Sequence, residues 1–212
     1  MSFDLLAPHY RWLEAVAAGN KLQRCRTAWL KRIPRAEKVL IYGDGNGRFL
    51  AELLRCFPAA QVTSVDISAR MITLARERLV REGLPLAQVE FVHANALKWI
   101  PPERTYDLVV THFFLDCFRP DQLAKLMPAI ANAAQAHAHW LVADFKVADG
   151  NCLKRWRSQM ILALMYVFFR AVTHLSARRI TPPDSLLAST GFALLHRVES
   201  DWGLLHSDCW GR

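Results

Sequence analysis

The chain has few cysteines, no long apolar run and no block of like charge. Its five cysteines are odd in number and form no CxxC pair, so the sequence predicts neither a metal site nor a disulfide framework. The longest uninterrupted apolar run extends from Ile161 to Phe169, far short of the roughly 20 residues that a membrane-spanning helix needs. We therefore expect a globular protein held together by an apolar core.

Basic residues outnumber acidic ones by 27 to 19, which gives a net charge of +8. A positive field of this size can attract nucleic acid, anionic lipid or an anionic substrate. The basic side chains are scattered, however, and no tail of like charge occurs. We therefore expect no nucleic-acid partner. The first twelve residues lack a basic segment followed by an apolar core, which favours a cytoplasmic protein.

Short apolar segments alternate with helical patterns along most of the chain. We predict strands at 38–42, 61–65, 89–93, 106–111 and 140–143, and helices at 5–18, 21–32, 48–56, 68–82 and 121–137. Two further strand-like runs, 192–199 and 204–210, are joined by too few residues for a crossover and must pair antiparallel. The sequence thus predicts an α/β fold, a doubly wound, seven-stranded, mostly parallel sheet that ends in an antiparallel hairpin.

We see no repeat and no linker, so residues 1–212 are expected to form a single domain. Within it we expect an N-terminal helical cap (1–36), a cofactor-binding core (37–145), a helical insertion or lid (146–182) and C-terminal strands (183–212).

A glycine-rich turn follows the first predicted strand. The run Gly43-Asp44-Gly45-Asn46-Gly47 opens the next helix, where backbone can approach a ligand and unpaired N–H groups are available. Asp66 ends the second strand, the position from which an acid binds a ribose diol in nucleotide-binding doubly wound folds. The alternative role for Asp66 is a helix cap.

The GxGxG spacing and the terminal hairpin resemble class I S-adenosylmethionine-dependent methyltransferases, which have a Rossmann-like fold; nicotinamide-binding domains use GxGxxG instead. The resemblance implies that the three glycines hold the methionine part of S-adenosyl-L-methionine and that Asp66 binds its ribose. It also implies that Ile67, Met71, Asn95 and Ala96 surround the adenine, and that Thr111 and His112 lie nearest the transferable methyl group.

The chain departs from this family at one position. Ile41 stands where the family usually has an acid, two residues before the first glycine. We expect Asp44, inside the loop, to replace it by contacting the methionyl ammonium; the alternative is a solvated loop residue. The departure leaves a noncatalytic cofactor-binding protein as an alternative function.

Methyl transfer from a sulfonium is an in-line displacement, so the enzyme mainly has to align the reacting atoms. A base is needed only when the acceptor arrives protonated. His112, at the end of a central strand, is the first candidate for that base, and Asp116 is the second, or the partner of His112. The alternative is that His112 only orients the cofactor or the loop.

The segment from 151 to 179 is the most distinctive part of the chain. Its middle is apolar on every helical face and basic residues flank it. This pattern predicts either a lid that also touches an anionic membrane surface, or a core helix or homodimer contact.

The opening Phe3-Asp4-Leu5-Leu6-Ala7-Pro8-His9-Tyr10 is similar to that of ubiquinone/menaquinone C-methyltransferase relatives. The resemblance suggests that Tyr10 caps the active site; the alternative is a surface helix. The N/D-P-P-Y/F/W segment typical of adenine or amide N-methylation is missing after the fourth strand. We therefore expect a methyltransferase that acts on a small, apolar or lipid-like molecule. The positive net charge leaves an RNA methyltransferase as the alternative.

Overall fold

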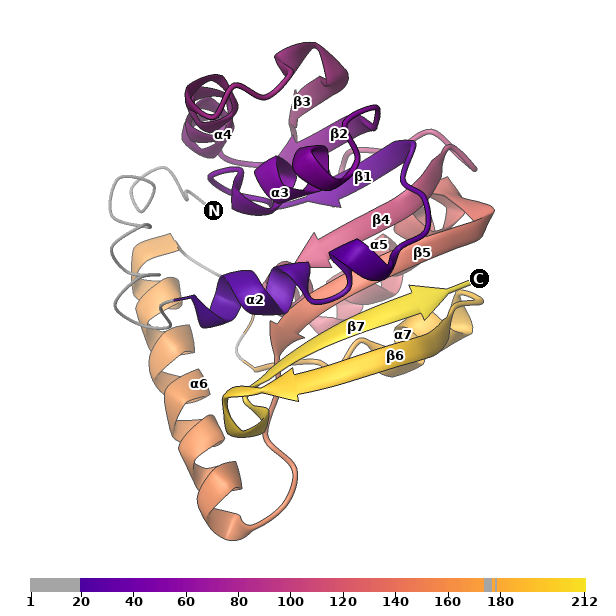
Figure 1. Cartoon of the computed structure of the whole chain (residues 1–212). Coiled ribbons are helices and arrows are strands. Elements are labelled where there is room, and N and C mark those ends of the chain that lie inside the picture. Colours follow the sequence, from indigo (N-terminus) through magenta and orange to yellow (C-terminus); the bar gives the residue numbers. More distant parts are fainter. Residues whose placement is uncertain (1–19, 174–176, 178) are drawn as a thin grey trace.

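The computed structural model describes residues 20–173, 177 and 179–212, and its centre is one seven-stranded sheet (Figure 1). The strand order is β3-β2-β1-β4-β5-β7-β6. The strands are β1 (Lys38–Tyr42), β2 (Gln61–Asp66), β3 (Val89–His93), β4 (Tyr106–His112), β5 (Ala134–Phe145), β6 (Ala193–Ser200) and β7 (Leu205–Gly211). The predicted fold class is therefore confirmed.

Strands β1 to β5 run parallel, and β7 pairs antiparallel with both β5 and β6. The central strands are apolar on both faces because helices cover both faces of the sheet. The parallel pairing brings the carboxyl ends of β1, β2, β4 and β5 to one edge of the sheet, the edge at which open α/β folds bind ligands.

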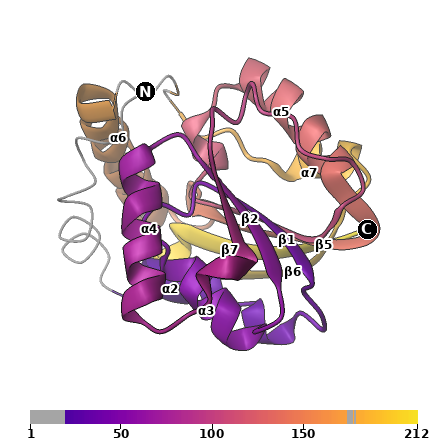
Figure 2. The ribbon, with the colours of Figure 1, turned by 90° about the horizontal axis from the view of Figure 1, so that it is seen from above.

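Helices form a layer on each side of the sheet, as the view from above shows (Figure 2). One layer holds α2 (Lys21–Thr27), α3 (Arg48–Cys56) and α4 (Ala69–Arg81). Helices α3 and α4 pack on Val39, Ile41 and Val110, and α2 packs on Ala143 and Leu205. The other holds α5 (Pro120–Ala133) and α7 (Asp184–Ser189), which pack on Leu40 and Trp140. The helix α6 (Cys152–Thr173) stands apart, beside the carboxyl edge of the sheet (Figure 1).

Two predicted helices are shorter than expected. The helix predicted for 121–137 ends at Ala133, and β5 begins at Ala134 because this segment pairs with the start of β4. The helix predicted for 21–32 ends at Thr27 and is followed by the short 3₁₀ helix η1 (Leu30–Arg32). In the alanine-rich segment where β5 begins, strand pairing with β4 overrides the local preference for helix.

The remaining differences lie at the two ends of the chain. The segment 183–212, expected to hold only strands, begins with the helix α7. The predicted helix at 5–18 and Tyr10 lie outside the described residues. Within the described parts of the chain, no helix is long and apolar enough to cross a membrane.

Candidate cofactor and active site

The glycine loop adopts a backbone that only glycine takes without strain. Gly43, Gly45 and Gly47 have φ of 65°, 65° and 77°. A Cβ on Gly47 would lie 2.9 Å from Cα of Ala75, so the close approach of α3 to α4 also requires glycine there. A Cβ on Gly45 would meet only Sδ of Met71, at 3.9 Å. The space beside Gly45 is therefore open to a ligand.

The loop and the acid at the end of β2 are in direct contact. The backbone N–H of Gly45 donates to Oδ2 of Asp66 at 3.2 Å, and that of Ser68 donates to Oδ1 at 2.9 Å. Burial raises the pKa of Asp66 above its usual range, and the two N–H donors act against that shift. The helix cap of α4 is Ser68, which accepts from the N–H of Met71, so Asp66 is not the capping residue.

The residues predicted around an adenine follow β2 and β3. The carbonyl of Ile67 contacts the His93 ring at 3.0 Å, which ties the ends of β2 and β3 together. Met71 lies on the first turn of α4, next to Gly45. Asn95 is half-buried, and its Oδ1 accepts from the N–H of Leu97 at 3.0 Å. A carbonyl oxygen has a second lone pair, so Asn95 can still accept a ligand hydrogen bond.

Asp44 is half-buried in the loop that precedes α3, and its predicted contact to the methionyl ammonium stays a prediction. Its Oδ2 accepts from the N–H of Leu50 at 3.2 Å. Burial raises the pKa of Asp44 to about 7, and the charge of Arg26 acts in the opposite direction. Asp44 therefore stabilises the N-terminus of α3 while it faces a nearby cation.

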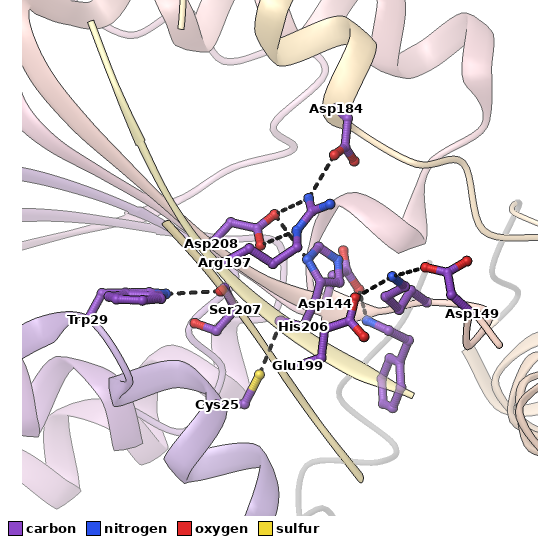
Figure 3. Close-up of polar contacts among 12 residues, drawn as sticks. Cys25, Trp29, Asp144, Asp149, Asp184, Arg197, Glu199, His206, Ser207 and Asp208 are labelled. Atoms are coloured by element: carbon purple, nitrogen blue, oxygen red, sulfur yellow. Dashed lines mark hydrogen bonds and ion pairs between the residues drawn. The ribbon is translucent and has the colours of Figure 1, made fainter. Parts of the chain in front are cut away.

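Arg26 is a site residue that the sequence prediction missed. It is 7% exposed, and its guanidinium lies 5.0 Å from the centre of the Phe113 ring. Two neighbours of Arg26 attach this part of the chain to β7 (Figure 3). Sγ of Cys25 donates to the His206 carbonyl, and Nε1 of Trp29 donates to the Ser207 carbonyl. No sequence signal distinguishes Arg26 from the other basic residues of α2.

His112 is 5% exposed at the end of β4. Its ring packs edge-on against Phe49, 4.5 Å between centres, and neither ring nitrogen has a hydrogen-bond partner among the described residues. Burial, aided by the charge of Arg26, holds the pKa of His112 well below its usual range. The imidazole is therefore neutral near pH 7.

Asp116 and Asp144 form a buried carboxyl pair at the ends of β4 and β5. Asp116 follows β4 in the short helix η3 (Leu115–Cys117), and its N–H donates to Oδ2 of Asp144 at 3.2 Å. Burial raises the pKa of Asp116 to about 6; burial and the charge of Asp116 raise that of Asp144 well above its usual range.

Two aromatic rings lie at the same edge of the sheet, on the face that carries α2. Phe113, in a left-handed turn with φ of 51°, packs against Phe145 with 5.1 Å between ring centres. From α6, the hydroxyl of Tyr166 donates to the Asp116 carbonyl at 3.1 Å. By contrast, the Thr111 hydroxyl accepts from the Trp140 indole at 2.9 Å and lies in the core. A role of the Thr111 side chain at the cofactor stays a prediction.

The site residues fit a polar, nucleotide-like cofactor. Three buried side chains around the glycine loop carry polar atoms without a partner among the described residues: Tyr42 at the end of β1, Asn46 in the loop and His112 at the end of β4. Buried polar atoms are rarely left unpaired, so these are candidates for ligand contacts. In the same described parts of the chain, no group of histidine, cysteine, aspartate and glutamate could hold a metal ion.

Comparison with known proteins agrees with this geometry. Residues 39–137 match a family model described as a methyltransferase domain. The chain is 30% identical over 116 residues to the ubiquinone/menaquinone biosynthesis C-methyltransferase UbiE of Ectopseudomonas oleovorans, covering 53% of this chain and 68% of that protein. It is 34% identical over 98 residues to trans-aconitate 2-methyltransferase of Afipia carboxidovorans, covering 45% of this chain and only 35% of that protein.

Solved structures share the fold at low identity. The mitomycin 7-O-methyltransferase MmcR superposes with a TM-score of 0.71 at 18% identity, covering 100% of this chain and 61% of that one. A SAM-dependent methyltransferase from Aquifex aeolicus gives 0.62 at 17% identity, covering 95% and 97%. The glycine loop and its contact with Asp66 agree with these similarities. The chain therefore belongs to the class I methyltransferases, enzymes whose cofactor is S-adenosyl-L-methionine.

Proposed function

We propose that this enzyme methylates a small apolar molecule whose acceptor atom arrives protonated, and that the Asp116–Asp144 pair takes up the proton. The observation that carries the proposal is the buried carboxyl pair at the ends of β4 and β5. Its raised pKa values make it a better proton acceptor near neutral pH than an ordinary carboxylate. His112, neutral and edge-on to Phe49, then serves to orient rather than to accept the proton.

The glycine loop, Asp44 and Asp66 would hold the cofactor in this proposal. Bound S-adenosylmethionine supplies a methyl group on a sulfonium, which an acceptor displaces in line. Asp66 supplies acceptors for ribose hydroxyls, and Asp44 supplies a negative charge for the methionyl ammonium. Arg26 and Phe113 close the same region from the side of α2, which reduces access of water.

Two features support an apolar acceptor. Phe113 and Phe145 pack against each other at the carboxyl edge of the sheet, and α6 packs over the carboxyl pair through Tyr166. A flat apolar ring would pack against such aromatic side chains. Two of the similar proteins are named for small molecules: UbiE for ubiquinone/menaquinone biosynthesis and MmcR for mitomycin.

A labelling experiment tests this function. The protein is incubated with S-adenosylmethionine labelled at the methyl group and with a panel of phenols, quinols and aromatic amines, and label that moves into an organic extract is counted. Transfer to at least one apolar acceptor is expected. Label found only in added RNA would support the alternative substrate, and its binding would weaken steeply with salt.

Asp44 provides a prediction on both stability and binding. Asparagine keeps the cap on α3 but removes the charge. A raised pKa means that the folded protein favours the protonated form of Asp44 over the ionised form. The contribution of Asp44 to folding stability is therefore favourable below the ordinary carboxyl pKa and is lost as the pH rises toward about 7. The variant Asp44→Asn, without cofactor, should therefore be more stable than the parent by roughly 1–3 kcal/mol at pH 8 and equal to it at pH 4.

The same variant should bind S-adenosylhomocysteine about tenfold more weakly at pH 8, because a charge-assisted contact to the ammonium is lost. Thermal melts at the two pH values and calorimetric titration measure the two effects separately. Unchanged affinity would show that Asp44 does not replace the acid missing at Ile41.

A further inference from the structure

One face of α6 packs on the protein and the opposite face is apolar and exposed. Ser158, Leu162 and Tyr166, spaced four residues apart, are 1%, 5% and 5% exposed. The opposite side carries a stripe that we call the α6 apolar face: Leu153, Trp156, Met160, Leu164 and Val167, exposed by 63, 61, 45, 65 and 68%. Spacings of three and four residues place these five side chains on one side of the helix. The core-helix interpretation of this segment is therefore wrong.

The charged residues that α6 itself carries are all of one sign. No aspartate or glutamate occurs between Cys152 and Thr173, whereas Lys154, Arg155, Arg157 and Arg170 do. At about 100° per residue, Lys154 and Arg170 fall on either side of the apolar stripe. Basic side chains in this position can keep their charged ends at lipid phosphates while the stripe enters the apolar layer.

A second exposed tryptophan lies near the start of α6. Trp202, in the turn η4 (Asp201–Gly203) between β6 and β7, is 64% exposed. The Arg157 guanidinium lies 5.6 Å from the centre of its ring and also bonds to Asp201. Two exposed indoles, Trp156 and Trp202, thus come from different elements at one end of the helix, and tryptophan is enriched where a protein meets the membrane–water interface.

We propose that the α6 apolar face docks on the surface of an anionic lipid bilayer, with the helix lying in the plane of the interface. Charge complementarity favours an anionic bilayer over a second copy of the chain as the partner. A second copy of the chain would bring the basic ends of two α6 helices together in either orientation, with no acid on the helix to balance them. An amphipathic helix with basic flanks and a tryptophan has the composition of an interfacial helix. This inference does not depend on the proposed function.

Vesicle flotation without cofactor or acceptor tests the proposal. The protein should float with vesicles of phosphatidylcholine and phosphatidylglycerol in equal parts, and less with phosphatidylcholine alone. Leu164→Glu, which introduces a charge into the stripe, should weaken the binding at least about tenfold. Its control is Val80→Glu on α4, at a position that is 64% exposed and so matches the 65% of Leu164. The control should float as the parent does.

A charge variant separates the two contributions. Replacing Lys154 and Arg170 by glutamine should weaken binding to the anionic vesicles about tenfold and leave binding to phosphatidylcholine unchanged. Sedimentation velocity checks the competing occupant: a dimer that Leu164→Glu makes monomeric would overturn the proposal in favour of a second copy. Absence of flotation, or equal flotation of Leu164→Glu and Val80→Glu, would also overturn it.

Discussion

Asp116→Asn is expected to slow methyl transfer by about 10²- to 10⁴-fold, measured as kcat on the best acceptor of the panel. The parent enzyme should show a rate that rises with pH through about 6, because the Asp116 carboxyl must lose its proton before it can accept one from the substrate. Without Asp116, the rate follows the ionisation of Asp144, whose pKa burial still raises, so the rising limb no longer lies at about 6.

Stability measurements separate catalysis from folding in this variant. Asp116→Asn removes one of two buried acids that repel each other, so its melting temperature should equal or exceed that of the parent. Asp149→Asn, an exposed aspartate near the same strand end, should change neither rate nor pH profile. In the His112→Ala variant, the rate should still rise with pH through about 6. If His112→Ala abolished that limb while Asp116→Asn retained it, the histidine would be the base and the carboxyl pair would not.

Gly45→Ala is expected to weaken binding of S-adenosylhomocysteine about a hundredfold or more, since a methyl group would occupy the open space beside the loop where a ligand approaches the backbone. Titration calorimetry measures the affinity. The substitution keeps the N–H that bonds to Asp66, so the loss would come from the added methyl and not from a missing donor.

Gly83→Ala is a matched control for this effect. Gly83 has the same φ of 65°, and a Cβ there would meet nothing within 4 Å. Both variants should lose about 1 kcal/mol of folding stability, the strain of a left-handed alanine, and both should melt at similar temperatures. Only Gly45→Ala should lose affinity. Equal affinity in the two variants would place the cofactor elsewhere than beside Gly45.

The sequence by itself determined the features that are local in the chain. The strand β1, the glycine loop after it and Asp66 at the end of β2 follow from short apolar runs and turn residues, because such signals act between neighbours in sequence. The terminal hairpin also followed from local information, since a connection of four residues cannot form a crossover. These features predicted the fold, and the resemblance of the GxGxG spacing and the hairpin to class I methyltransferases added the cofactor.

Only the tertiary structure decided which distant residues meet. Asp144 pairs with Asp116 because β4 and β5 run side by side, and Arg26 lies in the site because α2 packs on β7. In α6 the sequence is apolar all round, and packing of Tyr166 on η3 selects the face that is buried and leaves the opposite face exposed. Strand pairing and helix docking are non-local contacts, which no periodicity within one segment specifies.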